Sequence, residues 1–93
     1  MILQTPYEMA EDTAKRFSRL RKSKKITIKE LSERSGVPYS TLRRFESTGE
    51  ISFLSFVKIS SAIGEDHQIT GLFPESAPLS IEDVLRENRR RKK

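Results

Sequence analysis

The spacing of apolar residues in the middle of the chain predicts two short helices joined by a tight turn. Ile28 and Leu31 lie three positions apart and share one helical face. Leu42 and Phe45 repeat this spacing on the other side of the turn. The turn contains Gly36, whose missing Cβ permits the positive φ that a close helix-to-helix connection needs. The second helix of such a pair projects from the body of the fold.

Capping residues set the limits of this pair. Thr27, with Glu30 three positions later, forms a predicted capping box for a helix from about 28 to 34. The second helix is expected to begin at Pro38 or the next residue and to end at about Ser47, since proline is tolerated only in the first turn.

A longer helix is predicted upstream, from about residue 6 to 22. Thr5 and Glu8 form a second capping box around Pro6, which suits the first helical position. The residues expected to face the core follow a helical stripe made of Met9, Thr13, Phe17 and Leu20.

Two more helices are predicted after the central pair. The segment from about residue 52 to 63, which Gly64 terminates, has the wide apolar face of a buried helix. Asp66 is expected to cap a short fifth helix over residues 67–72.

The predicted fold class is all-α. Residues 1–73 are interpreted as a compact five-helix bundle that contains a helix-turn-helix. Residues 74–93 are interpreted as a proline-containing linker, a short helix that begins near Ser80, and a basic tail over 89–93.

Charge distribution favours a polyanionic partner. The chain has a net charge of +5 and a pI of about 9.8. Residues 15–25 carry seven cations and no acid, and residues 84–93 carry six cations and one acid. The projecting helix adds polar and basic side chains on the face away from its apolar residues, namely Tyr39, Ser40, Arg43 and Arg44. Together these features favour a DNA-binding helix-turn-helix over a plain helical hairpin.

The same composition argues against an enzyme. There is no cysteine and one histidine, His67, so neither a metal site nor a nucleophile-and-base constellation is expected, and no cofactor is predicted. No apolar run approaches the ~20 residues of a membrane span. The N-terminus lacks the charged and apolar regions of a signal peptide, so a cytoplasmic protein is expected.

Several spaced positions resemble the Xre type of helix-turn-helix, the Cro and phage-repressor-like family. The matching residues are Arg21-Lys22-Ser23-Lys24, Ile26-Thr27, Leu31-Ser32, Gly36-Val37, Ser40-Thr41-Leu42, Phe45-Glu46 and Ala62-Ile63-Gly64. The resemblance covers about Phe17 to Leu72. It implies a five-helix bundle that binds double-stranded DNA as a homodimer on a two-fold operator.

The resemblance also implies roles for individual residues. Tyr39, Ser40 and Arg44, with Arg43 beside them, match positions that read base edges. Lys24, Thr27, Ile28, Ser47 and Thr48 match positions that contact the DNA backbone. Arg21 and Glu46 match a buried ion pair between the first and third helices. Three positions depart from the family pattern: Ile28 replaces a common Gln, Pro38 a common Ser or Thr, and Lys25 a common Gly.

A narrower resemblance points to a partner protein. The run from Tyr39 to Ser52, with Leu72-Phe73-Pro74 and a basic tail, is similar to the HipB-like antitoxin repressors, which bind HipA-like kinase toxins. One alternative to a repressor is therefore an antitoxin whose main role is to neutralise such a kinase. Separately, the basic composition also suits an architectural nucleic-acid protein without sequence preference.

From the residues alone, Arg44 is the best candidate to read a guanine, because arginine can donate two hydrogen bonds to its O6 and N7. Its alternatives are a phosphate contact or a solvated surface side chain. The best candidates for phosphate contacts are Lys22, Lys24 and Arg43, with Thr41 as a further one. The predicted dimer or partner face comprises Ile69, Leu72 and Phe73.

Overall fold

The chain is all-α. The computed structural model describes residues 3–75 and 85–86, and no strand occurs among them. It contains five principal helices: α1 (Pro6–Ser23), α2 (Ile28–Ser35), α3 (Tyr39–Thr48), α4 (Phe53–Ala62) and α5 (Asp66–Thr70). The predicted fold class and the order of the five helices are confirmed.

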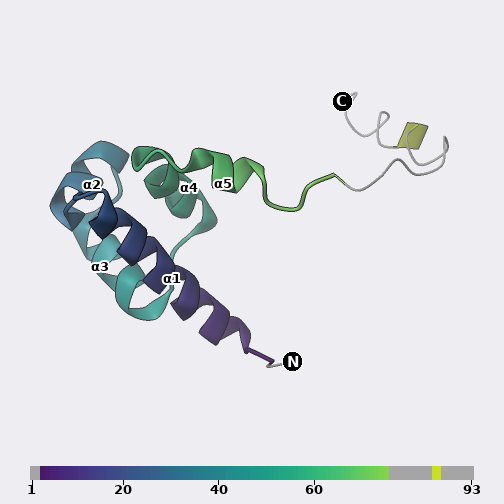
Figure 1. Ribbon diagram of the computed structural model, residues 1–93, viewed down its shortest axis with the longest axis horizontal. Helices are drawn as coiled ribbons and strands as arrows, with labels where there is room; N and C mark the ends of the chain where they lie inside the picture. Colours follow the sequence, from purple (N-terminus) through teal and green to yellow (C-terminus); the bar gives the residue numbers. More distant parts are fainter. Residues whose placement is uncertain (1–2, 76–84, 87–93) are drawn as a thin grey trace.

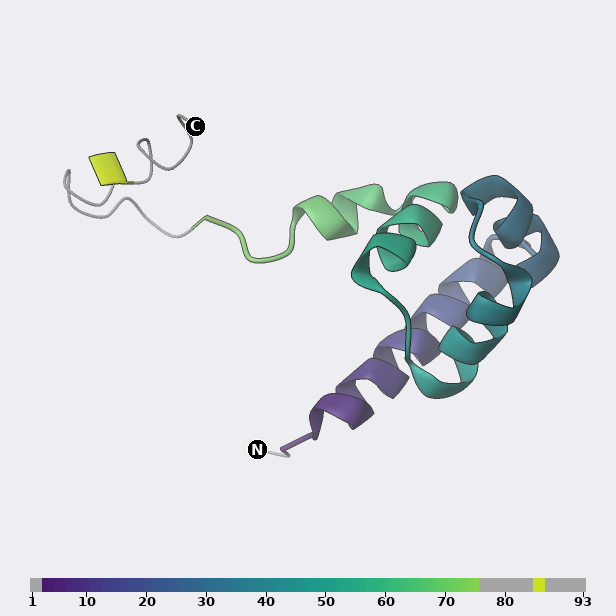
Figure 2. The same cartoon turned by 180° about the vertical axis from the view of Figure 1, so that it is seen from behind.

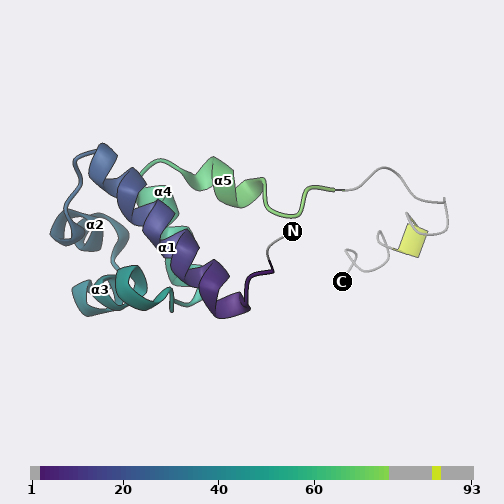
Figure 3. The same ribbon diagram turned by 60° about the horizontal axis from the view of Figure 1, so that its bottom comes forward.

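The helices form a bundle (Figure 1). α3 packs against α1, α2 lies against both α3 and α4, and α5 packs on α4. The view from behind and the tilted view show α3 and α5 on opposite sides of the bundle (Figures 2 and 3). The first turns of α1 extend beyond the other helices.

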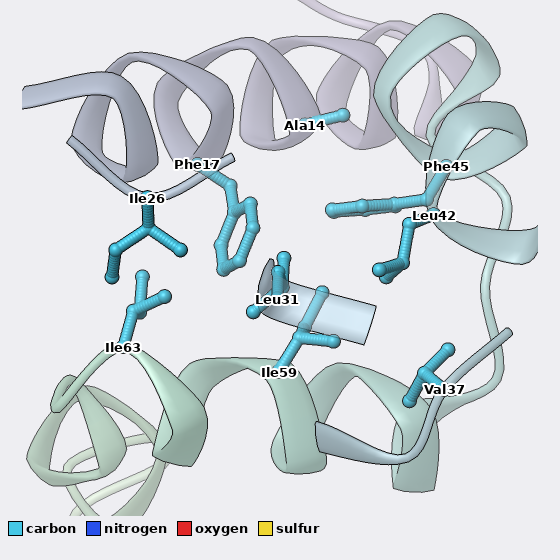
Figure 4. Close-up of a cluster of buried hydrophobic side chains, with 9 residues drawn as sticks. All are labelled: Ala14, Phe17, Ile26, Leu31, Val37, Leu42, Phe45, Ile59 and Ile63. Atoms are coloured by element: carbon cyan, nitrogen blue, oxygen red, sulfur yellow. The ribbon is translucent and has the colours of Figure 1, made fainter. Parts of the chain in front are cut away.

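The core lies where the four longer helices meet. Phe17, Phe45 and Phe56 come from α1, α3 and α4, and their ring centroids lie 5.6 to 6.2 Å apart in edge-to-face or tilted arrangements. Figure 4 shows the nine buried apolar side chains pointing into one interior: Ala14, Phe17, Ile26, Leu31, Val37, Leu42, Phe45, Ile59 and Ile63. This single core holds α3 in place by its buried face.

Local capping chemistry explains where two helices begin. In α1, the Thr5 hydroxyl accepts from the Glu8 N–H, and a Glu8 carboxylate oxygen accepts from the Thr5 N–H. Thr27 and Glu30 form the same reciprocal pair at α2. These hydrogen bonds lower the pKa of both glutamates, because they stabilise the ionised carboxylate. Both predicted capping boxes are confirmed.

The predicted buried stripe of α1 was wrong in its first half. Met9 is 52% exposed, because the first turns of α1 extend past the helices that could cover them. The buried positions of α1 are Ala14, Phe17 and Arg21. The helix is therefore rotated relative to the predicted stripe, and a charged residue takes a core position.

Two predictions for the later helices also need correction. The first turn of α4 is not buried: Phe53 and Leu54 are each 64% exposed, since α5 has five residues against ten in α4 and covers only part of it. Asp66 does not cap α5. Glu65 occupies the N-cap position and Asp66 the first turn, and α5 ends at Thr70.

Residue 25 joins α1 to the next loop in a left-handed conformation. Lys25 has a φ of +59°, a region that a Cβ disfavours and that glycine adopts freely. This explains why glycine is common at this position in the family that the sequence resembles. Here the backbone is held by the Lys25 N–H, which donates to the Lys22 carbonyl, and by the Ile26 N–H, which donates to the Arg21 carbonyl.

The described residues stop short of most of the C-terminal segment. The predicted helix start at Ser80 and the basic tail over 89–93 lie outside them. Leu85 and Arg86, in the predicted last helix, are described, and both are exposed. Within the described part of the chain, none of the helices has the length and apolar character needed to cross a bilayer.

Gly49 fixes the distance between the end of α3 and α1. Its φ is +83°, and a Cβ at this position would lie 2.6 Å from the carbonyl carbon of Ala10 and 2.8 Å from the N atom of Glu11. These neighbours are backbone atoms of a helix and cannot rotate away. Gly36 has a similar φ of +77° but no atom within 4 Å of the equivalent position.

The two glycines provide a matched pair of variants. We expect Gly36→Ala to lower the free energy of unfolding by about 1–2 kcal/mol, the cost of the left-handed conformation. Gly49→Ala adds steric overlap with α1, so its loss should be larger by about 1–3 kcal/mol. Chemical denaturation monitored by circular dichroism measures both. Equal losses would show that α1 does not pack against Gly49.

Candidate nucleic-acid interface

The turn between α2 and α3 determines how α3 projects. Gly36 adopts the left-handed conformation and donates its N–H to the Ser32 carbonyl at 2.9 Å. The next residue, Val37, is 2% exposed and anchors the turn in the core. Its N–H donates to the Ser35 hydroxyl, and its carbonyl accepts from the Ser32 hydroxyl at 2.7 Å. These contacts set the direction in which α3 leaves the turn.

The outer face of α3 carries the residues predicted to read bases. Leu42 and Phe45 are buried at 1% and 2% exposure, so α3 presents one face to the core. All four of the predicted base-reading residues are exposed: Tyr39, Ser40, Arg43 and Arg44. Thr41 is half-buried. The structure therefore brings these side chains together on one accessible surface.

Arg44 pairs with a carboxylate that no sequence pattern predicts, that of Glu50. Its Nε and Nη2 atoms both donate to Oε2 of Glu50, at 3.0 and 2.6 Å. The two side chains are 69% and 58% exposed. Because they lie six positions apart and α3 ends between them, no helical spacing rule links them. An acid followed by a cation at i+4, the usual sequence signal, is absent here.

The residues predicted to contact the DNA backbone differ in whether their side chains are already engaged within the protein. Lys22 is exposed, whereas the Lys24 ammonium pairs with Glu65 at 3.0 Å. The Thr27 hydroxyl is engaged as the cap of α2. The hydroxyls of Ser47 and Thr48 both donate to the Arg44 carbonyl, at 3.1 and 2.7 Å. A hydroxyl that donates within the protein can still accept a hydrogen bond, but it offers no second proton to a phosphate.

Glu65 connects the end of α1 to the start of α5. Hydrogen bonds from Lys24 and Gln68 lower the pKa of its carboxyl group, and the nearby charges of Lys24 and His67 act in the same direction. The distance between His67 Nε2 and Glu65 Oε1 is 3.6 Å. The only histidine thus has an acidic neighbour, and no group of three or more potential metal ligands occurs in the part of the chain described.

Arg21 of α1 and Glu46 of α3 form an ion pair in the interior. The Nε and Nη2 atoms of Arg21 donate to the two carboxylate oxygens of Glu46, at 2.8 and 2.9 Å. Arg21 Nη1 donates to the Ile26 carbonyl at 2.7 Å, and the Ser18 hydroxyl donates to Glu46 at 3.0 Å. The side chains of the pair are 7% and 12% exposed. This network joins α1, the loop after it and α3.

A second exposed surface lies on the side away from α3. Ile69 is half-buried, Leu72 is 47% exposed and Phe73 is 95% exposed with a φ of +47°. The exposed Phe53 and Leu54 belong to α4, on which α5 packs. The three residues of the predicted face are thus accessible, Ile69 only in part. The exposure of Phe53 and Leu54 was not predicted, because the segment over 52–63 was interpreted as a buried helix.

Comparison with known proteins identifies one family. A family model described as helix-turn-helix matches residues 18–69, which is more than half of the chain and runs from the last third of α1 into α5. Searches of curated proteins and of solved structures found no match. The matched region closely follows the part of the sequence that carries the resemblance.

The buried ion pair leads to a stability prediction. Glu46→Ala leaves Arg21 buried without its carboxylate, so the free energy of unfolding should fall by about 3–5 kcal/mol. Asp12→Ala, which breaks an exposed pair with Arg16, is the matched control and should cost at most about 1 kcal/mol. Thermal melts of the two variants measure the difference. Similar melting temperatures would contradict a structural role for the buried pair.

Proposed function

The chain belongs to the Cro/C1-type helix-turn-helix family and is a DNA-binding transcription regulator, and from this premise we propose that it is a sequence-specific repressor that binds a two-fold operator as a homodimer. The observation that carries the proposal is the outer face of α3, where Tyr39, Ser40, Arg43 and Arg44 are all exposed. A projecting helix with such side chains fits the major groove of DNA.

Base readout is assigned to the outer face of α3. Arg44 can donate two hydrogen bonds to guanine, and a good bidentate contact discriminates by about 1–3 kcal/mol. Tyr39 and Ser40 lie in the first turn of the helix, the part that approaches base edges in this kind of docking. Arg43 is adjacent and supplies either a base or a phosphate contact.

Backbone contacts are assigned to residues that surround this face. Lys22 is the strongest of them, because this residue is exposed. Lys24 must share its charge with Glu65, and Thr41 is only half-exposed, so both are weaker contributors. The Ser47 and Thr48 hydroxyls already donate to the Arg44 carbonyl, so they must give up that hydrogen bond to donate to a phosphate. The Thr27 hydroxyl accepts from the Glu30 N–H and keeps its own proton for a phosphate. Phosphate contacts of this kind hold the protein in register and carry little sequence information.

The dimer is assigned to the side of α5. Ile69, Leu72 and Phe73 provide apolar surface that the chain itself leaves accessible, and α4, on which α5 packs, adds the exposed Phe53 and Leu54. Dimerisation through this side leaves α3 uncovered. Two copies related by a two-fold axis would then place their α3 helices in successive major grooves, about 34 Å apart.

An antitoxin role is a second candidate. The exposed Leu72 and Phe73 belong to the segment that is similar to HipB-like repressors, and an exposed phenylalanine is a typical anchor for a protein partner. A HipA-like kinase toxin is the partner that this similarity suggests, with repression of the shared operon as the second activity. The two candidates differ in what covers Phe73.

Selection from a random duplex pool tests the repressor proposal. We expect enrichment of a palindrome with half-sites one helical turn apart. Affinity for it should fall with salt, with a slope of log K against log salt concentration of about −0.9 for each phosphate contact. Absence of an enriched palindrome, or affinity that does not change with salt, would refute the proposal.

Variants of the α5 side test the dimer. Leu72→Ser with Phe73→Asn removes apolar surface, and asparagine tolerates the positive φ of residue 73. We expect the dimer dissociation constant to rise at least about tenfold in sedimentation equilibrium. Leu3→Ser is the matched control, because Leu3 is 85% exposed at the other end of the described chain. An unchanged dimer in the double variant would place the interface elsewhere.

A further inference from the structure

One carboxylate holds the side edge of the Arg44 guanidinium. Nε and Nη2 both donate to the same oxygen of Glu50, Oε2, at 3.0 and 2.6 Å. Arginine has five N–H groups in a rigid planar fork. With the side edge occupied, the remaining N–H groups include the two parallel ones at the far end of the fork, on Nη1 and Nη2.

Glu50 is itself held in place. Its N–H donates to the Thr48 hydroxyl at 3.1 Å, and that hydroxyl donates to the Arg44 carbonyl at 2.7 Å. The intervening Gly49 packs directly on the backbone of α1. Glu50 therefore enters from a turn whose geometry is set by α3 on one side and by α1 on the other.

The free end of the fork matches the acceptor pattern of a single base. Guanine presents O6 and N7 side by side in the major groove, and two parallel N–H groups satisfy both. A long flexible side chain normally loses rotamer freedom when it makes such a contact. An arginine already held along one edge has less freedom to lose and presents one orientation of its donors.

We infer that Glu50 is a specificity-determining positioning residue, which directs the end of the Arg44 fork at a guanine of the operator. The inference rests on the proposed function. Because both side chains are largely exposed, the pair contributes little to folding stability, so its effect lies in orientation. The same carboxylate repels phosphates, so Glu50 lowers affinity for all DNA while it raises discrimination between bases.

A comparison of matched variants tests this inference. The operator is the palindrome enriched from the random pool. Binding of the unmodified chain, Glu50→Ala, Arg44→Ala and the Arg44→Ala/Glu50→Ala double variant is measured on this operator, on an operator with each guanine pair in turn replaced by an A·T pair, and on a random duplex. Glu33→Ala is the charge control, because Glu33 is exposed on α2 and forms no ion pair with residues 3–75. Melting curves check that the variants remain folded.

The expected pattern separates orientation from charge. Glu50→Ala should bind random duplex more tightly but should lose at least about fivefold of the discrimination at one guanine position. Arg44→Ala should lose discrimination at that same position, and adding Glu50→Ala to it should cause no further loss. Glu33→Ala should leave discrimination within about twofold of the unmodified chain.

Three results would overturn the inference. Unchanged discrimination in Glu50→Ala would reduce Glu50 to a repulsive charge. Increased discrimination would show that Glu50 competes with the base for Arg44. Loss of discrimination at different guanines in the Glu50 and Arg44 variants would show that the two residues do not act on the same base. If the unmodified chain itself bound operator and random duplex equally, the proposed function would fail and this inference with it.

Discussion

The buried ion pair of Arg21 and Glu46 is the interaction on which the rest of the structure depends. It joins residues 25 positions apart and links α1 to α3 in the interior. Two buried charges are tolerated only because further hydrogen bonds satisfy their remaining donors and acceptors. Here the Ser18 hydroxyl donates to Glu46, and Arg21 donates to the Ile26 carbonyl. Within the described residues, no buried side-chain nitrogen or oxygen lacks a hydrogen-bond partner. The orientation of α3 thus follows from a polar network together with aromatic packing.

Much of the fold could be predicted because its signals are local. The capping boxes of Thr5 with Glu8 and of Thr27 with Glu30 depend on residues three positions apart, and the left-handed Gly36 depends on its missing Cβ. The exposed face of α3 follows from the spacing of its two buried residues. Such features need no knowledge of distant neighbours, so sequence alone identified the helices and the candidate reading surface.

The errors concern contacts between distant parts of the chain. A helical stripe containing Met9 was as apolar as one containing Ala14, and only the uncovered first turns of α1 decide between them. Burial of Phe53 depended on how far α5 extends. The carboxylates that pair with Lys24 and Arg44 lie 41 and 6 positions away, beyond the end of the helix concerned, where no periodicity indicates proximity.

The long α1 also separates charge along the molecule. Its first turns carry Glu8, Glu11 and Asp12, while its last turns and the loop after it carry the cations of residues 15–25. With 18 residues, the helix spans about 27 Å at its usual rise. In the field of a polyanion such a separation produces a torque, which turns the cationic end of the helix toward the polyanion before any contact is made. The charge separation along α1 thus contributes to the orientation of a first encounter with a polyanion.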